Sequence, residues 1–193
     1  MNIYIVNGSP LLQGNTSTLL APVRETFEKA GHTVEEDFLY HLSLSGCLDC
    51  RACQKVSDRP GCAVKDDGIA ALNKMIWADL ILIASPLFTF GFTAPVKALL
   101  DRSFSMAKYY GDLPPHHLLA GKAMALVTTY GYPDEEALPL LEVPLQMMCQ
   151  LAHMRYLGAL GVRDINGLCD FTTPQADKKA RLFAEAAMAQ LSV

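Results

Sequence analysis

Short apolar runs alternate along this chain with longer segments of helical periodicity, and this alternation constrains the fold more than any other feature. Continuous apolar runs occupy residues 2–8, 79–86 and 122–129, and weaker strand patterns cover residues 32–40 and 155–165. Helical spacing or helix-start signals mark residues 15–31, 66–78, 93–104, 135–154 and 173–191. Strands that alternate with helices predict an α/β fold, in which a parallel sheet carries helices on both faces.

Prolines fall inside two of the predicted helices. Pro22 should kink the first helix or limit its first turns, because proline lacks the N–H group that a helix interior requires. Pro139 and Pro144 stand within residues 135–154 for the same reason, so we expect that helix to be broken.

The length and composition of the chain fit one domain, residues 1–193, since no repeat, linker or low-complexity tract divides it. The formal net charge is −4 and no basic stripe is present, which argues against a nucleic-acid partner. No apolar run approaches the length of a membrane span, and the N-terminus lacks the pattern of a signal peptide. We therefore expect a cytoplasmic protein without a membrane partner.

Ligands of parallel α/β sheets bind beyond the carboxyl ends of the strands, near the point where the strand order reverses. The loops that follow the first, third and fourth strands of the chain are therefore the ones to inspect. They cover residues 7–17, 85–97 and 128–135.

The first of these loops is rich in hydrogen-bond donors and leads into a helix. Gly8 and Gly14 allow tight backbone turns, while hydroxyl and amide groups come from Ser9, Asn15, Thr16 and Ser17. The spacing is not that of a Walker loop, because five residues separate the glycines and Asn15 replaces the lysine. A dinucleotide-binding G-x-G-x-x-G is absent too. A single phosphate monoester fits this loop best, and the alternative is a polar loop whose hydroxyls only cap the helix.

Aromatic side chains follow the third strand. Pro86 and Gly91 bracket a turn that contains Phe88 and Phe90. These rings, with the backbone of residues 87–91, can contact a planar aromatic ligand and its polar edge. Aromatic residues after a strand are also common as ordinary core residues, so this alternative stays open.

In order and spacing, the segments GSPLLQGNTSTLL, ASPLFTFGFTAPVKALLDR and VTTYG resemble the flavodoxin-like NADPH-dependent FMN reductases over nearly the whole chain. The resemblance implies a five-stranded parallel sheet in the order 2-1-3-4-5, FMN as cofactor and a homodimer or homotetramer. It places the FMN phosphate on residues 9–17 and the isoalloxazine ring between residues 86–91 and 128–131. The implied FMN-binding residues are Ser9, Gly14, Asn15, Thr16, Ser17, Pro86, Leu87, Phe88, Thr89, Phe90, Gly91, Thr128, Thr129, Tyr130 and Gly131.

Four of the six cysteines lie in the segment of residues 46–62, which we call the cysteine loop. Cys47, Cys50 and Cys53 are each two residues apart, and Cys62 follows after eight more residues. The segment resembles the compact cysteine motif of the iron–sulfur flavoproteins, although its last gap is slightly longer than that branch leads us to expect. This resemblance implies that the four cysteines bind a 4Fe-4S cluster close to the flavin.

The cysteine spacing by itself leaves four interpretations open. Three thiolates at this spacing, with a fourth nearby, can bind one iron–sulfur cluster. Zinc is an alternative, although structural zinc sites usually use two separated cysteine pairs. Cys53 and Arg59 have the C-x5-R spacing of a phosphatase loop, but Asp58 would repel the phosphate. The cysteines can also be free or redox-labile thiols.

Five further residues receive structural interpretations. We expect the isolated Cys149 and Cys169 to be buried thiols. Lys97, Asp101 and Arg102 share one predicted helix and are expected to form a salt-bridged surface or a subunit contact.

The expected function follows from the resemblance. NAD(P)H would deliver hydride to FMN, which passes electrons to flavin, quinone or iron–sulfur acceptors, and no catalytic residue is needed because the flavin supplies the chemistry. The alternative is an FMN electron carrier, with or without the cluster, that a ferredoxin-type partner reduces without nicotinamide turnover. A third class is a non-redox module in which zinc only braces the cysteine loop.

Overall fold

The computed structural model describes residues 1–191, in which five strands and five α-helices alternate along the chain. The strands are β1 (Asn2–Asn7), β2 (Thr33–Phe38), β3 (Leu80–Pro86), β4 (Ala123–Tyr130) and β5 (Arg155–Arg163). The α-helices are α1 (Asn15–Lys29), α2 (Gly68–Trp77), α3 (Ala94–Arg102), α4 (Asp134–Ala152) and α5 (Pro174–Leu191). Short 3-10 helices are η1 (Leu39–His41), η2 (Ala52–Lys55), η3 (Ser103–Met106) and η4 (Gly167–Phe171).

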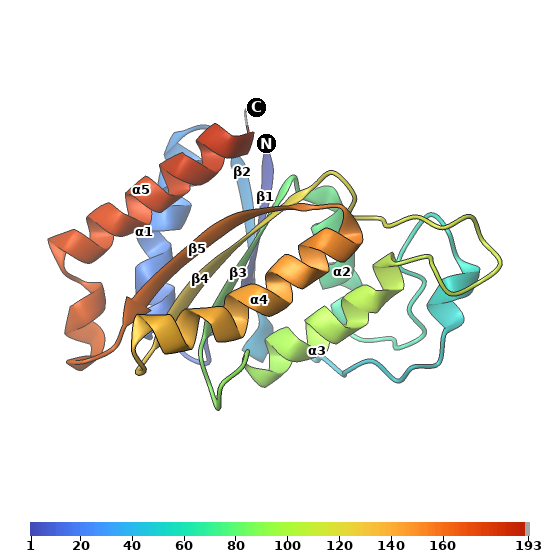
Figure 1. The fold of residues 1–193 in the computed structure, drawn as a ribbon, viewed down its shortest axis with the longest axis horizontal. Coiled ribbons are helices and arrows are strands. Elements are labelled where there is room, and N and C mark those ends of the chain that lie inside the picture. The colour runs from blue at the N-terminus through green and yellow to red at the C-terminus, as the bar shows by residue number, and fades with distance from the viewer. Residues whose placement is uncertain (192–193) are drawn as a thin grey trace.

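The five strands form one parallel sheet in the order β2-β1-β3-β4-β5 (Figure 1). This confirms the predicted fold class and strand order. It also places the weakly alternating β2 at an edge, where only one neighbouring strand covers it.

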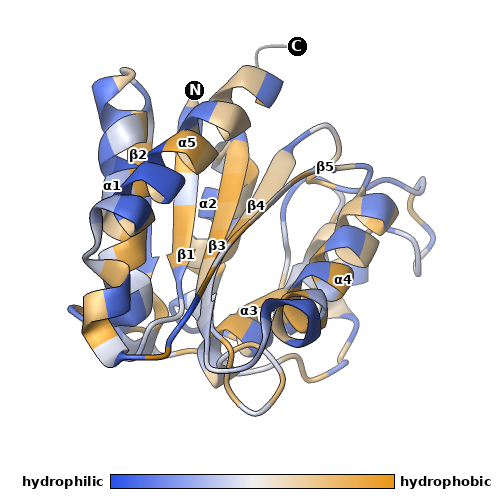
Figure 2. Cartoon of the chain, turned by 60° about the vertical axis from the view of Figure 1, so that its left-hand side comes forward, coloured by the Kyte–Doolittle hydropathy of each residue, from blue (hydrophilic) through white to orange (hydrophobic). Residues whose placement is uncertain are grey.

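Helices cover both faces of the sheet. On one face, α1 and α5 bury alternate residues of β1, β3 and β4, such as Ile5, Leu82 and Val127. On the other face, α2, α3 and α4 bury the residues between them, such as Val6 and Ile83. Figure 2 shows the result as hydrophobic central strands between helices that carry both hydrophilic and hydrophobic residues. The continuous apolar runs of the sequence follow from this burial on both faces.

The helix α4 is continuous from Asp134 to Ala152, so the expectation that Pro139 and Pro144 break it was wrong. Both prolines lie on the exposed face of α4. The carbonyl groups four residues before each proline lose their helical N–H partners. They lie on the exposed side of the helix, where water can donate hydrogen bonds to them instead. Similarly, α1 continues on both sides of Pro22. Within residues 1–191, no helix combines the length and the apolarity that a bilayer crossing requires.

Backbone hydrogen bonds join the carboxyl ends of the strands and hold the loops that leave them. The N–H of Gly8 donates to the carbonyl of Ala84 at 2.7 Å, and the N–H of Leu87 donates to the carbonyl of Thr129 at 2.9 Å. A side chain at position 8 would collide with Val96 of α3, which explains the glycine there. The loops after β1, β3 and β4 therefore meet at one edge of the sheet, as predicted for a ligand site.

Candidate functional site

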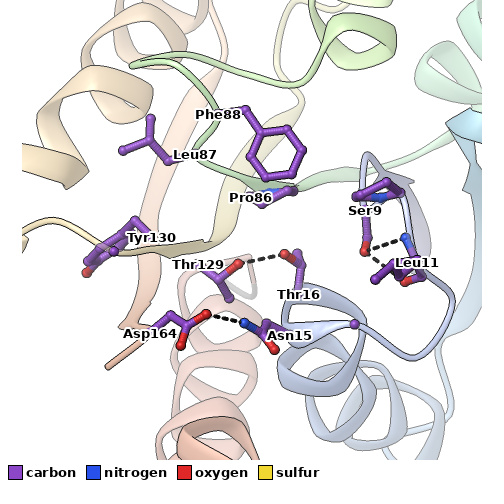
Figure 3. A pocket seen from close by; sticks show the side chains of 13 residues that line it. Ser9, Leu11, Asn15, Thr16, Pro86, Leu87, Phe88, Thr129, Tyr130 and Asp164 are labelled. Atoms are coloured by element: carbon purple, nitrogen blue, oxygen red, sulfur yellow. Dashed lines mark hydrogen bonds between the residues drawn. The ribbon is translucent and has the colours of Figure 1, made fainter. Parts of the chain in front are cut away.

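A pocket of about 320 Å³ opens where the loops after β1, β3 and β4 meet (Figure 3). Its position at the carboxyl edge of the sheet is the one that the strand alternation predicts. The residues that line it are Ser9, Pro10, Leu11, Gly14, Asn15, Thr16, Pro86, Leu87, Phe88, Thr129, Tyr130, Gly131 and Asp164.

The N-terminus of α1 forms one side of this pocket. Gly14 is its N-cap residue and has no side chain to accept a hydrogen bond from the first-turn N–H groups. Such groups have no partner within a helix, and together with the helix dipole they favour an anion. The preceding turn is fixed internally, because the hydroxyl of Ser9 donates to the carbonyl of Leu11 at 2.8 Å. The helix terminus is thus held in place and free of a side-chain cap.

A buried hydrogen bond at the floor of the pocket joins the loop after β1 to the loop after β4. The hydroxyl oxygens of Thr16 and Thr129 lie 2.7 Å apart (Figure 3), and both side chains are buried. This bond fixes the start of α1 against the end of β4. Next to it, Tyr130 lines the pocket, and burial together with the nearby Asp134 carboxylate raises the pKa of its hydroxyl. The Tyr130 side chain therefore stays neutral.

Asp164, which follows β5, lines the pocket although sequence reasoning did not select it. Its carboxylate accepts a hydrogen bond from the Asn15 side-chain amide at 2.6 Å (Figure 3) and one from the N–H of Gly167 at 2.8 Å. A carboxylate here repels phosphate but accepts hydrogen bonds from hydroxyl groups. The signal that could have found it is its place after a fifth strand, at the same carboxyl edge as the other loops.

The turn after β3 presents aromatic rings in a strained backbone conformation. The N–H of Phe88 donates to the carbonyl of Gly91 and the N–H of Gly91 donates back, both at 3.0 Å, which closes a tight turn. Thr89 and Phe90 at its tip have φ angles of 47° and 62°, a region that disfavours residues with side chains. Phe88 and Phe90 are 48% and 57% exposed. Strain and exposed rings in a loop at the pocket point to a ligand-binding role.

The cysteine loop surrounds a second, much smaller cavity of about 20 Å³. Among residues 1–191, no group of three or more ligand side chains is gathered closely enough to hold a single metal ion. The residues lining the cavity are Cys47, Leu48, Asp49, Cys50, Arg51, Cys53, Cys62, Ala63, Val64, Arg102, Phe104 and Ser105. All four cysteines of the loop therefore face one cavity without forming a single-ion site. None of the described residues lines both this cavity and the pocket at α1.

Arg102 is buried against the cysteine loop, so the expectation that it belongs to a salt-bridged surface was wrong. Its guanidinium pairs with Asp66, which lies 36 residues earlier in the chain, whereas Lys97 and Asp101 form the exposed pair that was expected. Burial acts to lower the pKa of Arg102, but Asp66 and the nearby Cys62 outweigh it, and the net shift is upward. A permanent positive charge therefore lies beside the cysteines.

The two isolated cysteines differ. Cys149 is buried in α4, as expected, and burial raises the pKa of its thiol to about 11. Cys169 is exposed in η4, so the expectation that it is buried was wrong. Position in the chain did not distinguish the two.

The family described as having the flavodoxin-like fold matches this sequence over residues 1–187. The chain belongs to this family. An iron–sulfur flavoprotein of Archaeoglobus fulgidus is 38% identical over 103 residues, which cover 53% of this chain and 49% of that protein. An FMN-dependent NADH:quinone oxidoreductase of Paraburkholderia phymatum is 25% identical over 181 residues, 85% of this chain and 84% of that protein.

Among solved structures, RosB with a bound 8-demethyl-8-formylriboflavin-5'-phosphate intermediate superposes with a TM-score of 0.76. The match covers 98% of this chain and 80% of RosB at 16% identity, so it shows that the flavodoxin-like fold is shared. The aligned part spans about half the length of the iron–sulfur flavoproteins that the chain matches.

Most of the residues selected from the sequence line the pocket of this flavodoxin-like fold. Those that do are Ser9, Gly14, Asn15, Thr16, Pro86, Leu87, Phe88, Thr129, Tyr130 and Gly131. Those that do not are Ser17, Thr89, Phe90, Gly91 and Thr128. Thr128 is fully buried, and strand alternation places its side chain on the sheet face opposite to that of Thr129. Ser17 instead donates its hydroxyl to the carbonyl of Leu11 at 2.9 Å.

Proposed function

We propose that this protein is an FMN-dependent NAD(P)H oxidoreductase of the cytoplasm, with residues 1–193 as a single FMN-binding domain. It would pass electrons from a nicotinamide to flavin, quinone or iron–sulfur acceptors. The observation that carries the proposal is the pocket at the carboxyl edge, which has an uncapped helix N-terminus on one side and aromatic side chains on another. The quinone oxidoreductase and iron–sulfur flavoprotein relatives support the same class of chemistry.

The pocket residues fit the three parts of FMN. The N–H groups at the start of α1 would hold the phosphate, with Thr16 and Ser9 beside it. Asp164 would accept hydrogen bonds from ribityl hydroxyl groups, since its carboxylate has acceptor capacity beyond its bonds to Asn15 and Gly167.

The isoalloxazine ring would lie between residues 86–88 and 129–131. Phe88 offers a flat apolar contact, and the turn of residues 88–91 holds it in place. When bound, FMN supplies the electron-transfer chemistry itself, so the residues of the pocket bind and orient it and need not exchange protons with the substrate.

Anaerobic mixing of the FMN-loaded protein with NADPH or NADH should bleach the flavin absorbance near its visible maximum. A quinone or free flavin added afterwards should restore the colour. We expect steady nicotinamide oxidation in the presence of the acceptor, measured by stopped-flow absorbance. If neither nicotinamide reduces the flavin but reduced ferredoxin does, the oxidoreductase proposal fails and the electron-carrier function replaces it.

The cysteine loop favours a second function, an FMN and iron–sulfur electron carrier that exchanges electrons with a ferredoxin-type partner. The four cysteines have the donor set of a 4Fe-4S cluster and face one cavity. Each thiolate of such a cluster binds a different iron atom, so the four sulfurs need not converge on one point. The cavity is smaller than the cluster, so the loop would open to admit it. Cys47 and Cys50 are exposed, and residues 42–51 have no regular secondary structure, which leaves room for this movement.

An apolar stripe on α4 supports a homodimer or homotetramer. Leu140, Val143, Met147 and Leu151 repeat at helical spacing and are 37% to 65% exposed. The stripe continues into a hollow that Met147, Leu151, Tyr110 and Cys47 help to line. Exposed apolar surface of this kind typically marks an interface.

Met147→Glu should dissociate the oligomer, because an unpaired carboxylate in an apolar interface costs several kcal/mol. Sedimentation velocity should show the association weakened by about a hundredfold or more. Leu182→Glu on α5, where Leu182 is also exposed, is the matched control and should leave the oligomer intact. A wild-type protein that stays monomeric at high concentration would contradict the proposal.

A further inference from the structure

Two buried side-chain donors without partners lie at the cavity of the cysteine loop. Among residues 1–191, Arg102 Nε and Ser105 Oγ are both buried and both lack a hydrogen-bond partner. Arg102 is 1% exposed and Ser105 is 3% exposed, and both residues line the cavity that the four cysteines also line. Buried polar groups are normally paired, so each orphaned donor calls for an explanation.

The guanidinium of Arg102 cannot rotate to find a hydrogen-bond partner for Nε. Its Nη1 pairs with Asp66 and also reaches the carbonyl of Ser45 at 3.4 Å, and Nη2 donates to the carbonyl of Val64 at 3.1 Å. Because the guanidinium is a rigid plane, these bonds fix the direction of Nε as well. Ser45 and Val64 flank the cysteine loop, so the same bonds tie both ends of the loop to the end of α3.

A second buried cation lies against the same loop. Lys108 is 1% exposed, and its ammonium donates to the carbonyls of Cys53 and Arg59 at 3.0 Å and of Pro60 at 3.2 Å. Within the described part of the chain, none of the ion pairs involves Lys108. Three carbonyl oxygens thus accept its hydrogen bonds, and the carboxylate that acts on its charge at longer range, Asp58, is exposed. Two cations, Arg102 and Lys108, are therefore buried beneath the loop. The carboxylate of Asp66 balances only one of them.

We propose that Arg102 and Ser105 donate hydrogen bonds to the sulfur atoms of a negatively charged iron–sulfur centre held by the cysteine loop, with Lys108 as a second counter-charge. The proposal rests on the proposed cluster and adds the residues that stabilise it. A centre with four thiolate ligands supplies the acceptors and the negative charge that this side of the cavity lacks. Donors and positive charge favour the reduced, more negative state, so these positioning residues would raise the reduction potential.

Ser105→Ala tests the inference because it should not destabilise the protein without a cluster but should destabilise the cluster in the loaded protein. Without a cluster, removal of an orphaned hydroxyl should leave the melting temperature unchanged or raise it. With a cluster, loss of the donor should speed release of iron to a chelator by about tenfold, the usual weight of a hydrogen bond to a charged acceptor. The midpoint potential should become more negative.

Ser103→Ala is the matched control in the same 3-10 helix. Its hydroxyl donates to the carbonyl of Leu100 at 2.6 Å and does not line the cysteine cavity. This variant should lower the melting temperature and leave iron release and potential as in the wild type.

Arg102→Lys is the second variant. It keeps the positive charge but loses Nε and the rigid plane, and its cluster should also be released faster and have a lower potential. Wild-type iron release and midpoint potential in both Ser105→Ala and Arg102→Lys would overturn the inference while leaving the proposed cluster in place. If the wild type instead takes up no iron and sulfide after anaerobic reconstitution, the proposed cluster fails and the inference fails with it.

Discussion

Apoprotein titrated with FMN and with riboflavin should bind FMN about a hundredfold or more tightly. The two ligands differ only in the phosphate, and the uncapped N–H groups of α1 are the feature that would bind it. Hydrogen bonds to a charged group contribute about 1.5–3 kcal/mol each, so two of them account for this ratio. Fluorescence quenching or calorimetry measures both affinities on the unmodified chain. Equal affinities would remove the phosphate site from α1.

Thr16→Glu should bind FMN about a hundredfold or more weakly than the wild type does. Thr16 lines the pocket in the first turn of α1, where a carboxylate would occupy the anion site and repel the phosphate. Riboflavin should lose much less, since it carries no charge. Thr18→Glu places the same charge on α1 outside the pocket lining and should bind FMN nearly as the wild type does. Circular dichroism of both variants separates loss of binding from loss of fold.

Anaerobic reconstitution with iron and sulfide should load about four iron atoms per chain, the content of one 4Fe-4S cluster. Cys50→Ala should lower the iron content sharply below that of the wild type, because it removes the thiolate ligand of one of the four irons. Metal analysis and the visible spectrum measure both. The exposed Cys47 and Cys50 make the centre accessible to oxygen, so aerobic preparations should lose it.

Cys169→Ala is the control for this experiment. Cys169 is exposed like Cys50 but lies in η4, away from the cysteine cavity, so its replacement should leave the iron content unchanged. A wild-type chain that binds FMN fully but no iron would mean that the cysteine loop carries free thiols. One zinc per chain without sulfide would favour the structural zinc interpretation.

Much of the fold and part of the candidate site could be predicted from the sequence. The strands β1, β3 and β4 are continuous apolar runs. A run of this kind indicates a strand that is buried on both faces of the sheet. The order of strands and helices then predicts a parallel sheet with its ligand loops at one edge. Ser9, Thr16 and Phe88 line the pocket because the loops that carry them are adjacent to these strands.

Contacts between residues far apart in the chain decided the rest, since local spacing carries no information about them. Arg102 has the helical spacing of a surface residue, but it is buried where the end of α3 meets Asp66 and the residues that flank the cysteine loop. Asp164 enters the pocket because the end of β5 lies beside Asn15, 149 residues earlier. Cys149 and Cys169 look alike as isolated residues, but packing buries one and exposes the other.

The sequence by itself therefore determined the parallel α/β sheet, the three loops at its carboxyl edge and the presence of the cysteine loop. Each of these depends on periodicity or spacing within a few residues. Only the tertiary structure placed the cysteine loop against the end of α3, where Arg102, Lys108 and the unpartnered hydroxyl of Ser105 are buried beside it. Burial of a charge depends on which distant groups surround it, and that is settled only when the chain has packed.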